Sequence, residues 1–180
     1  MKVLGISGSL RAASINSALL RAAVHLAPSA VTLSVFGGIG HLPLFNPDLE
    51  TQPPPQVIAL RNAVAASDAL LFASPEYAHG VTGAIKNTLD WLVSFEPFVD
   101  MPVAVLNASP RAHHADAALR ETLKTMSAVI VESASVSLPL LGAHLDEEGM
   151  VHDPLVASTL RDALLALHQA VVRGETRDHR

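Results

Sequence analysis

A short polar segment near the start of the chain has the residue types that bind a phosphate group. Residues 8–17 read Gly-Ser-Leu-Arg-Ala-Ala-Ser-Ile-Asn-Ser and lie between an apolar run and an apolar-periodic stretch. A strand that turns into a helix here would present unpaired N–H groups and a partial positive charge to an anion. The hydroxyl and amide side chains add donors, and Arg11 adds a full charge. We predict a phosphate site, with Ser14 as a simple helix N-cap as the alternative.

The spacing within this segment indicates which class of phosphate-containing ligand it could bind. It contains neither the Gly-x-Gly-x-x-Gly of dinucleotide-binding folds nor the Gly-Lys-Ser/Thr of a Walker loop. It also lacks the Gly-x-Ser-x-Gly elbow of a serine hydrolase. A terminal monophosphate fits best, and FMN is the common cofactor that carries one.

The elements that must position this segment alternate along the chain. Apolar runs predict strands at 3–7, 32–36, 69–73, 103–107 and 129–136, and several are continuously apolar, as covered parallel strands are. Helical periodicity follows at 15–27, 55–66, 83–94 and 115–126, and a last helix opens with Asp153 as N-cap and Pro154. This order predicts one doubly wound α/β domain over residues 1–172. The charged tail at 173–180 is expected to fray.

Two irregular segments interrupt the alternation. Residues 37–54 form a long loop, which could be functional, ordered by a partner, or a lid over the local core. Residues 138–152 include Asp146-Glu147-Glu148-Gly149, which lacks the alternating ligand spacing of a calcium loop. We expect a solvated turn there.

Composition excludes several classes of partner. The chain has 12 basic and 17 acidic residues with a net charge of −5 and no basic cluster, which argues against nucleic acid and anionic membranes. It has no cysteine, and so no disulfide, thiolate metal site or cysteine nucleophile. No apolar run approaches the roughly 18 residues of a membrane span. No signal peptide is visible, so we expect a cytoplasmic protein.

Three unusual loops follow the first, third and fourth predicted strands. In a parallel sheet of order 2-1-3-4-5, ligands bind at the carboxyl ends of these strands. The third strand leads into Pro75-Glu76-Tyr77, and the fourth leads into a loop that contains Ser109. Backbone N–H groups around Glu76 and Tyr77 suit the polar edge of a flavin. Tyr77 could cover ring area, and Ser109 could donate a hydrogen bond.

The motifs together resemble the NADPH-dependent FMN reductase family, which includes quinone, azo-dye and chromate reductases. The resemblance rests on Gly8-Ser9-Leu10-Arg11-x-x-Ser14-x-Asn16, on Pro75-Glu76-Tyr77 and on Gly83-x-x-Lys86-Asn87-x-x-Asp90-Trp91, and it spans residues 2–150. It implies a flavodoxin-like three-layer sandwich with a five-stranded parallel sheet of order 2-1-3-4-5. The FMN phosphate would be bound by Ser9, Arg11, Ser14, Asn16 and Ser17. The isoalloxazine would be contacted by Pro75, Glu76, Tyr77 and Ser109.

The resemblance also implies a reaction. The chain would transfer hydride from NADPH or NADH through FMN to a small acceptor such as a quinone, flavin, azo dye or metal oxyanion, with no catalytic side chain. A homodimer or homotetramer with the flavin near a subunit boundary is expected. The alternatives are a non-catalytic electron carrier of the flavodoxin type and a flavin-dependent sensor. Electron carriers tend to be strongly acidic, which this chain is not.

Several residues depart from the family pattern or have competing interpretations. Many members have Asn after the Tyr and a Gly-rich loop after strand 4, where this chain has Ala78-His79 and Pro110-Arg111-Ala112-His113-His114. His79 could contact the nicotinamide or serve a local structural role. Neighbouring histidines point in different directions, so no metal site is expected at His113-His114. Trp91 is expected in the core or at an interface, and Lys86 with Asp90 as a surface pair.

Overall fold

The central sheet is parallel throughout and has the predicted strand order. In this computed structural model, which describes residues 1–174, the strands follow the order β2-β1-β3-β4-β5. Their bounds are β1 Lys2–Ser7, β2 Thr32–Val35, β3 Ala69–Ala73, β4 Pro102–Asn107 and β5 Val129–Ile130. Alternating side chains along the central strands β1, β3 and β4 enter two separate cores, so both faces of the sheet are buried there.

The predicted fifth strand, 129–136, is interrupted. Two short strands, β5 and β6 (Val136–Ser137), both pair with β4, and a 3₁₀ turn at Glu132–Ala134 separates them. At the interruption the Ser135 hydroxyl accepts a hydrogen bond from the Val105 N–H at 3.1 Å and donates to the Val131 carbonyl at 3.0 Å. A side chain therefore takes the place of a backbone partner in the sheet, which an apolar run does not reveal.

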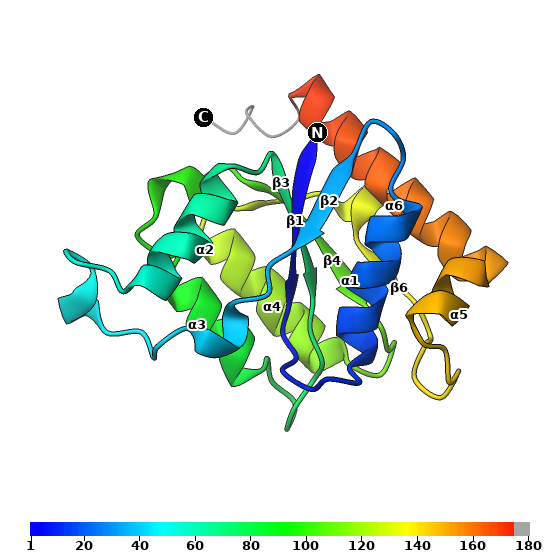
Figure 1. Cartoon of the computed structure of the whole chain (residues 1–180), viewed down its shortest axis with the longest axis horizontal. Helices are drawn as coiled ribbons and strands as arrows, with labels where there is room; N and C mark the ends of the chain where they lie inside the picture. The colour runs from blue at the N-terminus through cyan, green and yellow to red at the C-terminus, as the bar shows by residue number, and fades with distance from the viewer. Residues whose placement is uncertain (175–180) are drawn as a thin grey trace.

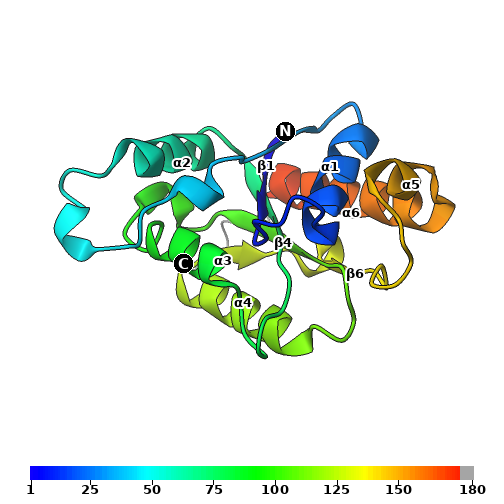
Figure 2. The same ribbon diagram turned by 60° about the horizontal axis from the view of Figure 1, so that its bottom comes forward.

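Helices cover the two faces of the sheet in separate layers (Figures 1 and 2). One layer holds α1 (Ile15–Leu26) and α6 (Pro154–Arg173), with the short α5 (Glu147–His152) beside α1. The other holds α2 (Pro55–Ala65), α3 (Gly83–Asp90) and α4 (His113–Thr125). Val3, Leu71 and Leu106 pack with the first layer. Leu4 and Phe72 pack with the second. This is the expected three-layer flavodoxin-like sandwich.

The helix that ends the domain begins as predicted and runs one residue further. The Asp153 carboxylate accepts hydrogen bonds from the N–H groups of Leu155 and Val156 at the start of α6. Arg173 is its last residue, so it belongs to the helix and not to the tail, while residues 175–180 lie outside the described part. Within residues 1–174, α6 alone is long and apolar enough to cross a membrane. Its apolar stripe is buried against the sheet and α1, as in a core helix of a folded domain.

The long segment 37–54 is fastened to α3. The indole N–H of Trp91 donates to the Pro43 carbonyl at 2.8 Å, and the Phe45 ring meets the Trp91 ring edge-on at 5.0 Å between centroids. Asn87 accepts from the Phe45 N–H at 2.8 Å and donates to the Pro43 carbonyl at 3.0 Å. Trp91 is fully buried, as expected of a core residue. This segment is therefore a lid over the local core at residues 42–45.

The predicted solvated turn at 146–149 is instead the start of a helix. The Asp146 carboxylate caps α5 by accepting from the Gly149 N–H at 2.8 Å. Glu147 bonds Arg21 Nε at 2.5 Å, and its other oxygen lies 3.0 Å from His25 Nε2. These contacts join α5 to α1, which is distant in the sequence.

Candidate functional site

The loops after β1 and β3 touch at the carboxyl end of the sheet, at the lower edge of Figure 1. The Gly8 N–H donates to the Ala73 carbonyl at 2.8 Å, and the Thr82 hydroxyl donates to the Gly8 carbonyl at 2.7 Å. A Cβ on Gly8 would lie 2.1 Å from the Ser74 hydroxyl oxygen and 2.6 Å from the Ser74 Cβ. Only glycine permits this approach.

A cavity of about 450 Å³ opens beside this contact. Its phosphate half is lined by Ser9, Arg11, Ser14 and Asn16, and its ring half by Pro75, Glu76, Tyr77 and Ser109. The three predicted loops thus meet around one space. Ser17 does not line it: the Ser17 hydroxyl lies 2.7 Å from the Ser7 hydroxyl and joins α1 to the end of β1.

The phosphate half has unused donors and an unused acceptor. Ser14 is the N-cap of α1 and accepts from the Ser17 N–H at 3.3 Å, yet its hydroxyl retains a hydrogen to donate. The N–H groups of Ile15 and Asn16 donate to no acceptor within residues 1–174. Asn16 is buried, and its Oδ1 has no partner there. A phosphate with a hydroxylated chain attached would satisfy these groups, so the residues present fit FMN.

The ring half is shaped by a tight hairpin turn. The N–H of Tyr77 donates to the Gly80 carbonyl at 3.1 Å, and the Gly80 N–H returns a bond to the Tyr77 carbonyl at 3.0 Å. Ala78 and His79 between them have φ angles of 49° and 60°. The Tyr77 N–H is therefore not free for a flavin, contrary to our expectation. The Glu76 N–H has no acceptor in the described part of the chain, so it remains available.

Glu76 ties this turn to the next helix. Its Oε2 accepts from the Ala115 N–H at the start of α4 at 2.9 Å. This backbone hydrogen bond is the main reason that the pKa of Glu76 lies below its ordinary value, and the nearby His114 and His79 act in the same direction. The carboxylate thereby joins the loop after β3 to the start of α4.

Two histidine rings near Glu76 stack on each other, and a third ring is tilted against them. The rings of His79 and His114 are parallel within 10° at 4.4 Å, and His113 lies 4.1 Å from His114 with a tilt of 38°. In-plane lone pairs of parallel rings do not converge on one point. Within residues 1–174 no group of three or more His, Asp or Glu side chains is placed to hold a metal ion.

The cavity also includes residues that sequence reasoning did not select. Asn107 ends β4, accepts from the Ser109 N–H at 2.9 Å and donates to the Ala112 carbonyl at 3.3 Å. A polar residue at the carboxyl end of a central strand was a signal that could have found it. Arg111 and Leu141 complete the wall. Leu141 comes from the irregular segment after β6 and has no local signal.

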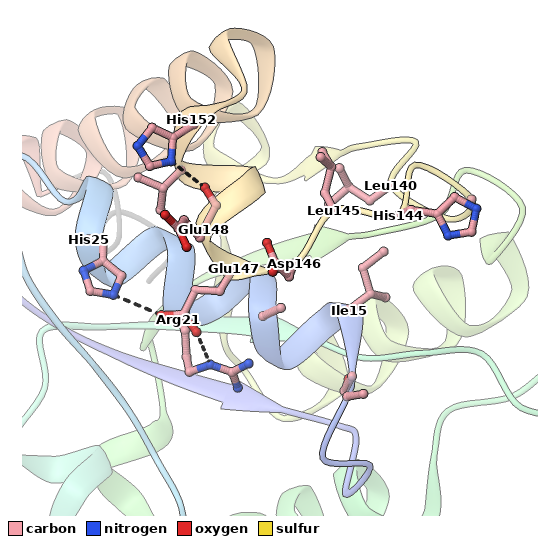
Figure 3. A pocket seen from close by; sticks show the side chains of 15 residues that line it. Ile15, Arg21, His25, Leu140, His144, Leu145, Asp146, Glu147, Glu148 and His152 are labelled. Atoms are coloured by element: carbon pink, nitrogen blue, oxygen red, sulfur yellow. Dashed lines mark hydrogen bonds and ion pairs between the residues drawn. The ribbon is translucent and has the colours of Figure 1, made fainter.

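A larger cavity, of about 810 Å³, lies on the other side of α1 (Figure 3). It is bounded by α1, the segment 140–146 and α5, and Arg21 and His25 point toward Glu147 at its wall. It shares only Ala13, Ser14 and Ile15 with the smaller cavity. None of the loops after β3 and β4 reaches it. We therefore assign the flavin to the smaller cavity, where the phosphate donors and the ring loops meet.

Comparison with known proteins gives the family of the chain. Residues 1–141 match the family model described as NADPH-dependent FMN reductase. The chain belongs to this family. It is 35% identical over 179 residues to an NAD(P)H-dependent FMN reductase of Pseudomonas aeruginosa, with 96% of each chain covered. It is 33% identical to a probable NADPH:quinone oxidoreductase of Oryza sativa, with 96% of this chain and 90% of the relative covered.

A solved structure of a flavoenzyme has the same fold as this chain. The flavoenzyme NAD(P)H:(acceptor) oxidoreductase of Paracoccus denitrificans superposes with a TM-score of 0.83 at 28% identity, covering 96% of this chain and 97% of that one. This NADPH-dependent FMN reductase family member is accordingly an oxidoreductase that uses FMN and NAD(P)H.

Proposed function

We propose that this reductase passes electrons from NAD(P)H through FMN to a quinone-type acceptor. The observation that carries the proposal is the apolar wall beside the ring half of the cavity. Tyr77 and Leu141 line it and are 58% and 57% exposed, so they offer flat and flexible apolar surface to a planar acceptor. A quinone reductase of Pseudomonas putida, 33% identical with 82% of this chain covered, supports the same class of acceptor.

In the proposed function, the side chains of this chain bind FMN and orient its ring. Arg11, Ser9, Ser14 and Asn16 would hold the FMN phosphate and the adjoining hydroxylated chain. FMN, when bound, supplies the capacity to accept a hydride and to reduce an acceptor. The backbone at Pro75 and Glu76 and the Ser109 hydroxyl, which makes no hydrogen bond within residues 1–174, would position the ring. No acid or base lining the cavity is required for a hydride transfer, so we propose no catalytic side chain.

A panel of acceptors tests this function. The FMN-loaded protein is mixed with NADPH or NADH and with menadione, free FMN, an azo dye or chromate, and the loss of nicotinamide absorbance is followed. We expect menadione to give the highest kcat/KM. Nicotinamide oxidation that no quinone accelerates above the rate without acceptor would contradict the proposal.

We further propose that the protein is a homodimer or homotetramer in the cytoplasm. Leu10 and Leu44 are 63% and 84% exposed, and Leu10 lies beside Gly40 in the segment that carries Leu44. A second subunit would bury these apolar side chains next to the phosphate loop. Light scattering tests the assembly, since a mass near the 18.9 kDa of one chain would contradict it. Cell fractionation tests the location.

A further inference from the structure

The flavin cavity is lined by two cationic side chains, of which only Arg11 belongs to the phosphate loop. Two guanidinium groups, Arg11 and Arg111, line it, and Glu76 is its only lining carboxylate among the described residues. Neither arginine forms an ion pair with a carboxylate in residues 1–174. The Glu76 carboxylate is already bonded to the Ala115 N–H. This local balance contrasts with the net charge of −5 of the whole chain.

The two arginines come from loops that follow different strands. Arg11 follows β1, next to the start of α1 where the phosphate donors are. Arg111 follows β4, which is separated from β1 by β3, on the same loop as Ser109. Arg11 is therefore placed for the FMN phosphate, and Arg111 stands at the ring half, where the reactants must approach.

The backbone that carries Arg111 is held in place although its side chain is exposed. Asn107 accepts from the Ser109 N–H and donates to the Ala112 carbonyl, and the Ala112 N–H donates to the Ser109 carbonyl at 2.9 Å. The Arg111 carbonyl lies 3.1 Å from His113 Nδ1. The turn therefore fixes the backbone at Arg111, while its exposed side chain lines the cavity and can reach an anion there. Arginine binds phosphate and sulfonate groups through paired, charge-assisted hydrogen bonds.

We propose that Arg111 selects reactants that carry an anionic group next to the flavin ring. Two reactants can supply that group: the 2′-phosphate of NADPH, which NADH lacks, or an acidic substituent on the acceptor. The inference rests on the proposed reaction, since both reactants must enter this cavity. It makes Arg111 a specificity-determining residue of the rim.

The test compares Arg111→Gln with a matched control, Arg161→Gln, on the exposed side of α6. Binding of NADP⁺ and NAD⁺ to the FMN-loaded protein is measured by calorimetry at low and high salt. In parallel, kcat/KM is measured for NADPH and NADH with menadione, and for menadione and its water-soluble analogue 1,4-naphthoquinone-2-sulfonate with NADPH. Arg111→Lys separates loss of charge from loss of the paired donors.

We expect Arg111→Gln to lower at least one ratio, NADPH to NADH or sulfonated to neutral quinone, by about tenfold, and Arg161→Gln to lower neither. A change confined to the nucleotide ratios, including NADP⁺ binding, assigns the 2′-phosphate. A change confined to the quinone ratio assigns the acceptor. Unchanged ratios, or an equal loss for every reactant as expected if Arg111 acted on the flavin itself, would overturn the inference.

Failure of the proposed function is distinguishable from failure of this inference. If the unaltered protein reduces quinones but Arg111→Gln leaves all ratios intact, the function stands and the role of Arg111 is wrong. If no quinone is reduced but NADP⁺ binding still depends on Arg111, the role of Arg111 stands and the acceptor is wrong.

Discussion

Ser9 and Arg11 lie on the loop between β1 and α1 and face the phosphate half of the cavity. Their hydrogen bonds to a phosphate have no counterpart in riboflavin, which ends in a hydroxyl. We expect the double variant Ser9→Ala/Arg11→Ala to weaken FMN binding by about 100-fold and riboflavin binding by less than about threefold. Quenching of flavin fluorescence by the apoprotein measures both, with Arg161→Ala as control. Equal losses for both flavins would show that this loop does not bind the phosphate.

Ala78 is in the left-handed region with a φ of 49°, which disfavours any residue with a Cβ other than Asn or Asp. His79 beside it also has positive φ, and stacking on His114 offsets part of that strain. Ala78→Asn should therefore raise the free energy of unfolding by roughly 0.5–1 kcal/mol. Chemical denaturation measures it. Ala143→Asn, at an exposed loop alanine without positive φ, is the control and should show no gain.

At the scale of elements, the contact between the loops after β1 and β3 decides whether the two halves of the cavity align. Gly8→Ala would place a Cβ against Ser74 and force the loops apart. We expect FMN affinity to fall at least about tenfold, since displaced donors lose their hydrogen bonds. Gly83→Ala is the matched control: its Cβ would meet nothing within 4 Å, and α3 would gain up to about 1 kcal/mol in stability. Equal FMN affinity in both variants would contradict the argument.

The ion pair that joins α5 to α1 makes stability depend on pH. The Arg21 hydrogen bond holds the pKa of Glu147 below its ordinary value of 4.5. Because the folded pKa is the lower one, the contribution is complete above 4.5 and is lost as pH falls through the folded pKa. Glu147→Gln should therefore be less stable than the unaltered protein at neutral pH, by less than about 1 kcal/mol because the pair is partly exposed. Thermal unfolding at several pH values measures this difference in stability, which should shrink as the pH falls below 4.5. A difference that grows as the pH falls below 4.5 would contradict the lowered pKa of Glu147.

At the scale of the whole molecule, the three layers leave the carboxyl edge of the sheet as the place where all cavity loops meet (Figure 2). Loops that hold FMN by its phosphate, its polar edge and one ring face would leave a single ring face open, and both reactants must approach that face closely. We expect ping-pong kinetics, with NADP⁺ leaving before the acceptor enters. Initial rates at varied NADPH and several fixed menadione concentrations should give parallel double-reciprocal lines. Intersecting lines would indicate a ternary complex and exclude sequential use of the open ring face.

The strands, the helices and the loops of the candidate site follow from local signals in the sequence, whereas the sheet order was implied by the family resemblance. Ser14 and Asp153 mark the starts of α1 and α6 in the sequence, because an N-cap bonds backbone N–H groups only two or three positions away. The polar residues of the phosphate loop and of Pro75-Glu76-Tyr77 stand directly after apolar strands. Parallel topology then brings those strand ends together without further information.

Most of the features that the sequence alone did not determine depend on groups far apart in the chain. The fifth strand breaks because the Ser135 hydroxyl meets the Val105 N–H across the sheet. The helix α5 is held by Arg21, 126 positions away. The Tyr77 N–H is lost to a local turn, but that turn has positive φ at Ala78 and His79, which these residue types do not signal. The entry of Leu141 into the cavity wall likewise requires the folded chain. Hydrogen bonds and apolar contacts of this kind form only once topology has placed their partners, so periodicity and local motifs cannot encode them.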